Sequence, residues 1–490
     1  MCRCLPRLTQ LRHAKADSKN ASRETIMEHH KRGSFKGSFG FVLAAAGSAV
    51  GLGNIWRFPY LAARDGGGLF LVIYIILALT FGFAMLTSEV AIGRKTKQSP
   101  LTAYGKLSKR WSWIGIFSCL VPFLIMPYYC VIGGWVIKYF WAFLTGHGLE
   151  AAQDGYFSTF ITGQYEPLIF LVIFLAACAF VIFNGVTKGI EQSSKILMPI
   201  LIVLVIGIAV YSLTLSHTND AGQTVSGLDG LKVYLIPSFK GVTLNKFFHI
   251  VVDALMQLFY SLSIAMGIMI AYGSYVPDRS NLSRSINHIE IFDTVVAFLA
   301  GVMIIPAVYV FMGPDGMSTG PSLMFVSLPK IFAAMGPAGN IVGTVFFAMV
   351  LFAALTSGIS IMEAVISSFM DRFKFSRKKA TLIESGFALL IGVVVCLGYN
   401  LLYFELKLPN SENPGQILDV LDYISNYLMM PIIALATCIL IGWVLKPDII
   451  IDEVTKNGEK FRRKTLYKIM TRYVSPIFII VILLFSLGIL

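Results

Sequence analysis

Charged residues are scarce in this chain: Asp, Glu, Lys and Arg make up only 14% of its 490 residues, whereas 56% are hydrophobic. A soluble protein carries about a quarter charged residues, so the composition excludes a soluble enzyme. It also excludes a disordered chain, because such chains are poor in hydrophobic residues. The apolar residues gather in runs of about 20, which is the length that spans a bilayer core as a helix. The sequence therefore predicts a polytopic membrane protein.

Cysteine pairs, a cleavable leader and a nucleotide-binding loop are also missing. Five of the seven cysteines lie within apolar runs, where a free thiol behaves as a small hydrophobe, and Cys2 and Cys4 are too few for a zinc site. The first 26 residues contain no apolar segment, so no cleavable signal peptide is expected. The absence of a Walker A phosphate-binding loop disfavours ATP-driven transport.

The net charge of +13 reports membrane topology rather than nucleic-acid binding. Of the 40 Lys and Arg residues, 31 lie in the N-terminal tail and in the segments 94–110, 184–195, 276–285, 371–380 and 446–468. The segments between them hold few: 146–167, 213–245, 313–337 and 401–417. This alternation follows the positive-inside rule and places the N-terminus in the cytoplasm. The basic tail alone leaves open a patch for RNA or acidic lipid.

Eleven apolar stretches are long enough to be transmembrane helices. They lie at about 40–64, 69–92, 113–145, 168–184, 192–214, 246–275, 285–312, 338–370, 382–401, 418–445 and 469–490. An odd number of spans with the N-terminus inside puts the C-terminus outside, in a multi-pass protein of the plasma or inner membrane. The loop 313–337 is rich in Gly, Pro and Met, and is expected to hold short helices over a vestibule.

Two spans contain residues that interrupt a helix. The first carries three glycines, Asn54, Arg57 and Pro59, and the sixth carries polar residues between Gln257 and Gly267. They occupy matching positions if spans one to five and six to ten are two repeats, and the second repeat is then inverted. Interrupted helices at matching positions of inverted halves indicate a transporter site at the bilayer midplane. The expected parts are a basic tail (1–36), a first five-helix repeat (37–214), an inverted second repeat (246–445) and an eleventh helix (466–490).

Each of these features also has a simpler interpretation. Gly47 and Gly51 form a GxxxG pattern, which by itself favours close helix packing. Thr356 and Ser357 lie in the eighth span, and such hydroxyls usually bond to their own backbone. Asp293 in span seven fits a helix-end acid, but carboxylates inside a membrane are mostly functional. Helix packing alone does not explain Arg57 in the first span, because burying an arginine in a membrane costs about 3 kcal/mol or more and requires a partner.

The motifs resemble the neurotransmitter:sodium symporter family. The stretch 47–60 fits GxAVGLGNxWRFPY, and further matches are Gly66 to Gly68, Tyr74, Gly93-Arg94, Tyr128-Tyr129, Gln257 with Ser261, and Leu355-Thr356-Ser357. The resemblance covers nearly all of the chain from Arg32 onward. It implies an all-α membrane protein with a 5+5 inverted repeat and broken helices 1 and 6, as in the leucine-transporter-like fold. The eleven spans resemble the bacterial amino-acid transporters of the family.

The resemblance implies two sodium sites. The first would be formed by Ala49, Asn54, Ser261 and Asp293 together with the substrate carboxylate. The second would be formed by the carbonyls of Gly47, Val50 and Ala353 with the hydroxyls of Thr356 and Ser357. Na⁺ is a hard cation, and such neutral oxygens suit it without a buried carboxylate.

It also implies a substrate site and two gates. The substrate residues would be Ser48, Ala49, Leu52, Gly53, Ile125, Tyr129, Tyr260, Ser261, Ser263, Met266, Ser357 and Ile361. The substrate carboxylate would lie near the amides of Leu52 and Gly53 and near Tyr129, since helix N-termini attract anions. Arg57 with Asp422 would close the outer path, and Arg32 with Asp371 the cytoplasmic side.

Two departures from the family pattern bear on the type of substrate and on the need for chloride. Monoamine transporters have an Asp where this chain has Gly51, so the ligand should bring its own carboxylate, as an amino acid does. Relatives have a sodium-binding Asn where an ungapped count from Tyr275 places Asp293. A carboxylate there would replace the chloride that animal members hold near Tyr74, Gln257 and Ser261, and would allow proton return in the empty carrier.

The sequence thus predicts a sodium-coupled, chloride-independent symporter that imports a hydrophobic or aromatic amino acid, such as tryptophan, tyrosine, phenylalanine or leucine, by alternating access. It is not expected to be an enzyme or to bind nucleic acid, and its oligomeric state stays open. Three alternatives remain: an ion channel, an amino-acid sensor, and a proton-coupled permease of the same fold. Channels usually repeat their filter elements around a symmetry axis, which two inverted halves do not.

Overall fold

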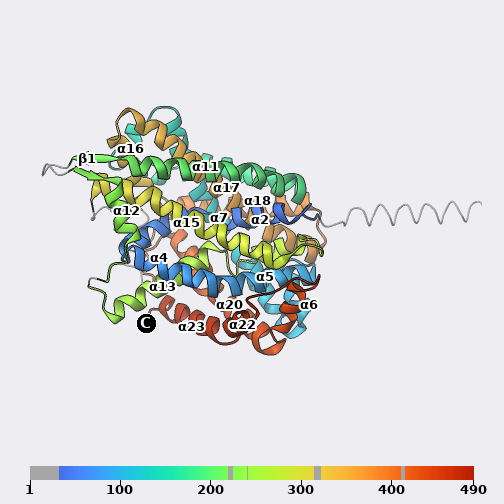
Figure 1. Cartoon of the computed structure of the whole chain (residues 1–490). Coiled ribbons are helices and arrows are strands. Elements are labelled where there is room, and N and C mark those ends of the chain that lie inside the picture. The colour runs from blue at the N-terminus through green and yellow to red at the C-terminus, as the bar shows by residue number, and fades with distance from the viewer. Residues whose placement is uncertain (1–32, 219–223, 240, 314–321, 410–413, 490) are drawn as a thin grey trace, which may run out of the picture. The chain divides into compact units, whose positions relative to one another are not determined.

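The computed structural model describes residues 33–218, 224–239, 241–313, 322–409 and 414–489. Contacts divide the chain into two units, Met1–Ser34 and Phe35–Leu490. The second unit is a bundle of helices with a single short hairpin among its described residues (Figure 1).

The first half of the bundle contains five long helical segments and the short elements that join them. They are α2 (Ser38–Ala49), η1 (Gly53–Arg57), α3 (Phe58–Arg64), α4 (Gly68–Leu77), η2 (Ala78–Gly82), α5 (Phe83–Thr96), α6 (Pro100–Leu107), η3 (Lys109–Trp111), α7 (Ser112–Leu144), α8 (Gly148–Ala151), α9 (Tyr156–Thr162), α10 (Glu166–Phe183), η4 (Val186–Glu191) and α11 (Gln192–Thr214). The antiparallel hairpin of β1 (Ser216–Thr218) and β2 (Thr224–Ser226) follows and leads into α12 (Gly227–Leu235).

The second half contains the remaining long helices. They are α13 (Leu244–Ser261), α14 (Ile268–Tyr275), α15 (Leu282–Met312), η6 (Leu323–Ser327), α16 (Leu328–Ala334), α17 (Pro337–Phe373), α18 (Arg377–Leu397), α19 (Ile417–Asp422), η7 (Tyr423–Met429), α20 (Met430–Ile439), η8 (Leu440–Val444), α21 (Asp448–Val454), α22 (Lys464–Ile469), η9 (Met470–Val474) and α23 (Ser475–Ser486). The short helices η6 and α16 lie in the loop where the sequence predicts them.

The helices agree with the predicted membrane architecture. Within the described residues, nine are long and apolar enough to cross a membrane, and the bent pair Ser38–Ala49 and Gly53–Arg64 makes a tenth. The pair α13 and α14, interrupted at 262–267, lies where the sequence predicts its sixth span, so the structure is consistent with eleven. The five described cysteines are buried free thiols.

The core of the bundle lies where the interrupted helices meet the long ones. Helix α17 packs along α7, α14 packs on α5, and α15 packs on both α2 and α11. The outer helices α10, α11 and α18 keep many large apolar side chains exposed, among them Val203, Phe180 and Leu390. This inside-out distribution is expected for a bundle whose outer surface meets lipid. Polar side chains in the buried centre are therefore the candidates for a functional site.

One buried ion pair joins two distant parts of the chain. Arg94 at the end of α5 is 1% exposed, and its Nε lies 2.7 Å from Glu453 Oε1 in α21. Its other nitrogens donate to the Ser280 carbonyl, at 2.8 Å, and to the Glu453 carbonyl. Arg94 thus ties α5 to α21 and to the loop before α15 through buried hydrogen bonds.

Replacing Arg94 by methionine is expected to destabilise the protein by about 3–5 kcal/mol, because Glu453 would stay buried without its partner. Thermal unfolding of the purified protein in detergent measures the effect. The matched control is Lys232→Met, which removes an exposed ion pair with Asp229 at 2.9 Å and is expected to change stability by less than about 1 kcal/mol. Equal stability of the two variants would contradict this prediction.

Candidate functional site

The first transmembrane helix is interrupted between Ala49 and Gly53. Helix α2 ends at Ala49, and Val50 leaves the helical conformation with φ −79° and ψ 85°. The axis then turns by 55° before η1 and α3 continue. Residues 50–52 of the break are buried in the bundle, in agreement with the break that the sequence predicts.

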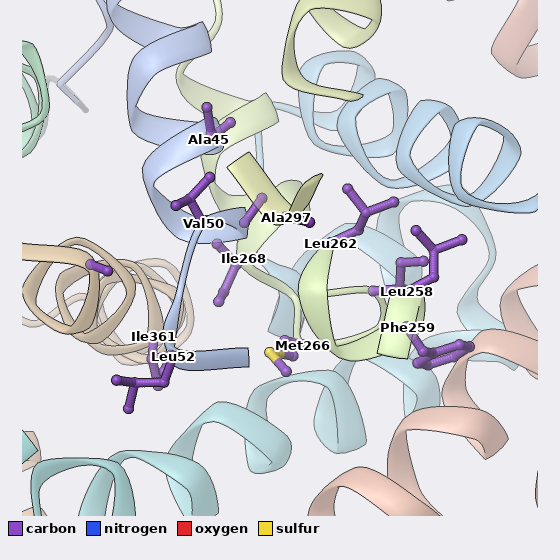
Figure 2. Close-up of a cluster of buried hydrophobic side chains, with 14 of the residues drawn as sticks. Ala45, Val50, Leu52, Leu258, Phe259, Leu262, Met266, Ile268, Ala297 and Ile361 are labelled. Atoms are coloured by element: carbon purple, nitrogen blue, oxygen red, sulfur yellow. The ribbon is translucent and has the colours of Figure 1, made fainter. Parts of the chain in front are cut away.

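The helix pair α13 and α14 is interrupted more widely, at residues 262–267. Ser263 and Ala265 have positive φ angles of 52° and 64°, and Gly267 follows at 73°. Non-glycine residues in this region cost about 1–3 kcal/mol each and persist only where the surroundings hold them. Glu89 on α5 provides such a hold, because its Oε1 accepts a hydrogen bond from the Ala265 amide at 2.6 Å. Figure 2 shows Met266 on this unwound segment, and Val50 and Leu52 on the one that follows α2.

Asp293 on α15 stands at the centre of a polar cluster between the two breaks. Its Oδ1 accepts hydrogen bonds from Asn54 Nδ2 at 2.8 Å and from the Ser261 hydroxyl at 2.7 Å. Its Oδ2 accepts a weaker bond from the Tyr74 hydroxyl at 3.3 Å. Asp293 is completely buried, so it is not a helix-end acid at the interface. The structure brings together three side chains that the resemblance assigns to a first sodium ion.

A second group of oxygens lies between α2 and α17. The Ser357 hydroxyl donates to the carbonyls of Gly47, at 3.3 Å, and Ser48, at 3.1 Å. Thr356 donates to its own helix, to the carbonyls of Phe352 and Ala353, as the simpler interpretation of these hydroxyls predicts. The second of these bonds, at 3.0 Å, keeps the Thr356 oxygen beside the Ala353 carbonyl, and both oxygens are among those expected to bind the second sodium ion. The side chains and carbonyls proposed for the second sodium ion thus lie on the two facing helices.

The predicted substrate residues come from five helices and the two breaks. Ser48 and Ala49 end α2; Leu52 lies in the first break and Gly53 begins η1; Ile125 and Tyr129 lie on α7; Tyr260 and Ser261 end α13; Ser263 and Met266 lie in the second break; Ser357 and Ile361 lie on α17. Across the breaks, Ser48 Oγ and Ser263 Oγ are 3.4 Å apart.

The space beside Gly51 and Gly53 is tight and partly polar. A Cβ atom on Gly51 would lie 2.8 Å from Ser357 Oγ and 3.8 Å from the Tyr129 hydroxyl. A Cβ atom on Gly53 would lie 2.6 Å from the Tyr260 ring. The Tyr129 hydroxyl is buried and has no hydrogen-bond partner among the described residues, although Ser357 is close. A buried donor without a partner is costly, so this hydroxyl is available to a bound acceptor.

A family model matches this chain over most of its length. The sodium:neurotransmitter symporter family model covers residues 32–151 and 161–489. The chain belongs to this family. It is therefore a sodium-dependent, multi-pass membrane symporter and not an enzyme.

The relatives of this symporter agree with that assignment. It is 33% identical to the uncharacterized sodium-dependent transporter YhdH of Bacillus subtilis over 95% of this chain and 100% of that protein. It is 27% identical to the human sodium- and chloride-dependent taurine transporter over 84% of this chain and 72% of that protein. The solved structure of MhsT in complex with L-phenylalanine matches with a TM-score of 0.80 and 33% identity, over 93% of this chain and all of that one.

The residues predicted for the outer gate of the symporter lie near each other without pairing directly. Among the described residues, Arg57 has no ion pair within 4.0 Å, but it is close enough to Tyr427 and Asp422 to interact with them electrostatically. Asp422 instead accepts hydrogen bonds from Tyr128, at 3.0 Å, and Asn426, at 2.5 Å. Arg57, Tyr260, Asn426 and Tyr427 line one small cavity.

The residues predicted for the inner gate are only partly covered by the structure. Arg32 lies outside the described residues. Asp371 at the end of α17 accepts a hydrogen bond from the Ser99 amide at 2.6 Å. About two turns earlier on α17, the buried Glu363 forms a bidentate pair with Arg377, at 2.6 and 2.9 Å, and accepts a bond from Tyr275 at 2.6 Å.

Sequence reasoning missed Asn426 and undervalued Glu89. Asn426 follows Asp422 by four residues, which places both on one face of a helix, and this spacing was the available signal. Glu89 lies in the predicted second span, and its position in the sequence indicates only an acid that pairs with polar neighbours or ties helices together. The structure shows that it stabilises the unwound segment of the sixth span through Ala265.

Proposed function

We propose that this chain imports an aromatic or large aliphatic amino acid together with sodium. The observation that carries the proposal is the Tyr129 hydroxyl, which is buried without a partner among the described residues and lies 3.8 Å from where a Cβ atom on Gly51, in the first break, would be. A substrate carboxylate would accept its hydrogen bond. Gly51 supports an amino acid over a monoamine, because no acidic side chain occupies that position and the space beside it is filled by Ser357.

The proposed pocket for the substrate side chain is apolar. Ile125, Met266 and Ile361 are all buried, and Tyr260 closes the same region. Met266 is flexible enough to adapt to side chains of different shape. Figure 2 shows Leu52 and Ile361 near the first break and Met266 on the second. The ligand of the matched structure, L-phenylalanine, is an aromatic amino acid and supports this substrate class.

Two sodium ions are proposed, with no requirement for chloride. Asn54, Ser261 and Asp293 would bind the first ion with the Ala49 carbonyl and the substrate carboxylate. Gly47, Val50, Ala353, Thr356 and Ser357 would bind the second. The Asp293 carboxylate already accepts the Tyr74 and Ser261 hydroxyls, which are groups that would otherwise hold chloride. Asp293 is thus proposed to supply the compensating negative charge.

This stoichiometry is sufficient for uphill transport. Two sodium ions with a zwitterion carry two charges, worth about 4.6 kcal/mol at 100 mV. That energy supports about a thousand-fold accumulation before the sodium gradient is counted.

The proposed cycle uses the two halves of the bundle. The segments 37–214 and 246–445 would be the inverted repeats, with the N-terminus in the cytoplasm and the C-terminus outside, as the basic loops indicate. Arg57 and Asp422 would pair directly when the outer path closes, and Arg32 and Asp371 when the inner path closes.

Uptake into proteoliposomes tests the function. Radiolabelled tryptophan, tyrosine, phenylalanine and leucine are offered with sodium outside and then with potassium. We expect accumulation above equilibrium with sodium outside but not with potassium. Replacing chloride by gluconate should leave this accumulation unchanged. Binding without accumulation would indicate a sensor, accumulation driven by a proton gradient alone would indicate a proton-coupled permease, and a loss of uptake without chloride would refute the role of Asp293.

Ser357→Ala is expected to raise the sodium concentration for half-maximal uptake by about ten-fold, because a hydroxyl ligand worth about 1.5 kcal/mol to a charged partner is lost. The matched control is Ser367→Ala on the same helix, whose hydroxyl only bonds back to the Ala364 carbonyl at 3.2 Å. Its sodium dependence should not change. A normal sodium dependence in Ser357→Ala would remove this residue from the second ion site.

A further inference from the structure

The last two long helical segments meet at a seam in which each helix is widened. The π-helical turns η8 (Leu440–Val444) and η9 (Met470–Val474) lie side by side, and α20 packs along α23 (Figure 1). They are joined reciprocally: Trp443 Nε1 donates to the Arg472 carbonyl, and Arg472 Nε donates to the Gly442 carbonyl, both at 3.0 Å. Single π-helical turns within α-helices are frequent at functional sites.

The reciprocal bonds fix the Arg472 guanidinium at the surface of the seam. Arginine has five N–H groups, and only Nε of Arg472 has a hydrogen-bond partner among the described residues. Gly442 allows this close approach, because a Cβ atom there would lie 2.9 Å from the Thr471 carbonyl. The remaining N–H groups are therefore held in a fixed fork, which suits phosphate oxygens.

Further positive charges share the neighbourhood of Asp448 with Arg472. Lys464, Lys468 and Arg472 all act electrostatically on Asp448, and Lys446 is two residues away from it. Lys468 donates to Asp448 at 2.7 Å, and this bond lowers the pKa of the Asp448 carboxyl below its ordinary value. The carboxyl stays ionised and neutralises one charge. Four cations against one anion leave the seam positive.

The exposed side of the seam carries two aromatic side chains, and exposed apolar side chains follow them along both helices. Trp443 is 57% exposed and Tyr473 is 51% exposed, and their rings lie perpendicular at 5.6 Å. Trp and Tyr favour the level of the lipid headgroups. From there, exposed apolar side chains continue along both helices into the membrane: Ile432 and Ile439 on α20, Ile477 and Ile480 on α23. A ligand that fits has an anionic head and hydrocarbon tails.

We propose that this seam is a binding site for an anionic phospholipid. The phosphate lies against the Arg472 guanidinium and within the field of Lys446 and Lys464, the glycerol region lies on Trp443 and Tyr473, and the acyl chains follow Ile439 and Ile477. The occupant is a lipid rather than a second copy of the chain, because the cations would repel a second positive copy and the apolar stripe already lies on a membrane-facing surface.

Fluorescence quenching by brominated lipids tests the proposal in the full-length protein. The symporter is reconstituted in phosphatidylcholine with equal fractions of brominated phosphatidylglycerol or brominated phosphatidylcholine. The signal of Trp443 is the difference between the wild type and Trp443→Phe. We expect Trp443 to be quenched about five-fold more strongly by the anionic lipid, which corresponds to one effective charge interaction at the surface. Arg472→Gln should reduce this preference to about one.

The control variant is Arg110→Gln. Arg110 is an exposed arginine beside Trp111 and Trp113, so it has the charge and aromatic neighbours without the anchored fork. It should leave the Trp443 preference unchanged. If both variants lost the preference for the anionic lipid equally, general surface charge would explain it and the proposal would be overturned. Displacement of the lipid by soluble glycerol phosphate would also overturn it, as a site for free phosphate esters. So would quenching that falls for both lipids as protein density rises, since a second copy would then cover the seam.

Discussion

Replacing Asp293 by asparagine is expected to make uptake depend on chloride. In chloride-free medium the rate should fall about ten- to hundred-fold, since a charged hydrogen-bond acceptor of about 1.5–3 kcal/mol is lost beside the proposed sodium ion. Asparagine keeps an oxygen for Asn54 and Ser261, which bond Oδ1 at 2.8 and 2.7 Å. At the other position an NH₂ group replaces Oδ2 and cannot accept the bond from Tyr74.

The Tyr74 hydroxyl of this variant is then a free donor in a buried site that has lost a negative charge. Chloride is the small anion that would restore both the charge and the bond, so adding it should recover most of the uptake. The measurement is the initial rate of sodium-driven uptake in chloride and in gluconate, at equal sodium concentration. The proposed charge compensation is wrong if Asp293→Asn transports at the wild-type rate in gluconate.

A matched buried acid separates this effect from the general loss of a carboxylate. Glu384 on α18 is fully buried, and neither of its oxygens has a hydrogen-bond partner among the described residues. Glu384→Gln replaces a second buried acid, one that lacks the amide and hydroxyl partners of Asp293 and lies away from the proposed ion sites. Its uptake should be insensitive to chloride. A chloride response in both variants would show that any buried acid of the bundle has this effect.

The positions of the two breaks could be predicted because they depend on the residue types at the breaks themselves. Three glycines with Asn54 and Arg57 cannot form an ordinary lipid-facing helix, and the structure interrupts the helix at Val50. The sequence also indicated Asn54, Ser261 and Asp293 as partners, although Asn54 is more than two hundred residues away from both Ser261 and Asp293. Only the resemblance to a family supplied that long-range pairing, because periodicity alone says nothing about which helices meet.

Other features depend on packing and could not be predicted. Ser263 and Ala265 adopt positive φ angles that their residue types disfavour, and the bond from Ala265 to Glu89 on another helix helps to hold them. The expected pair of Arg57 with Asp422 assumed a closed gate, whereas here Tyr128 and Asn426 bond to the carboxylate. Both outcomes follow from the arrangement of neighbouring helices, which the residues themselves do not specify.

Gly53→Ala is expected to weaken the binding of every substrate about ten- to hundred-fold. The new methyl group would lie 2.6 and 2.8 Å from two carbons of the Tyr260 ring. Such overpacking costs about 1–3 kcal/mol, and the Tyr260 ring, which lines the small cavity beside Arg57, would have to shift to relieve it. Gly53 lies beside the proposed position of the substrate carboxylate, which all amino acids share. The affinities for tryptophan, tyrosine, phenylalanine and leucine should therefore fall by a similar factor, measured by equilibrium binding to the purified protein in sodium.

The control for this variant is Gly207→Ala on α11, where a Cβ atom would meet nothing within 4 Å. It should bind all four amino acids as the wild type does. A loss in Gly53→Ala that affected only the largest side chains would place Gly53 beside the substrate side chain instead, and the proposed orientation of the substrate would have to be reversed. A uniform loss with normal thermal stability, in contrast, ties the carboxylate to the first break, where the amides of Leu52 and Gly53 and the Tyr129 hydroxyl can bind it together.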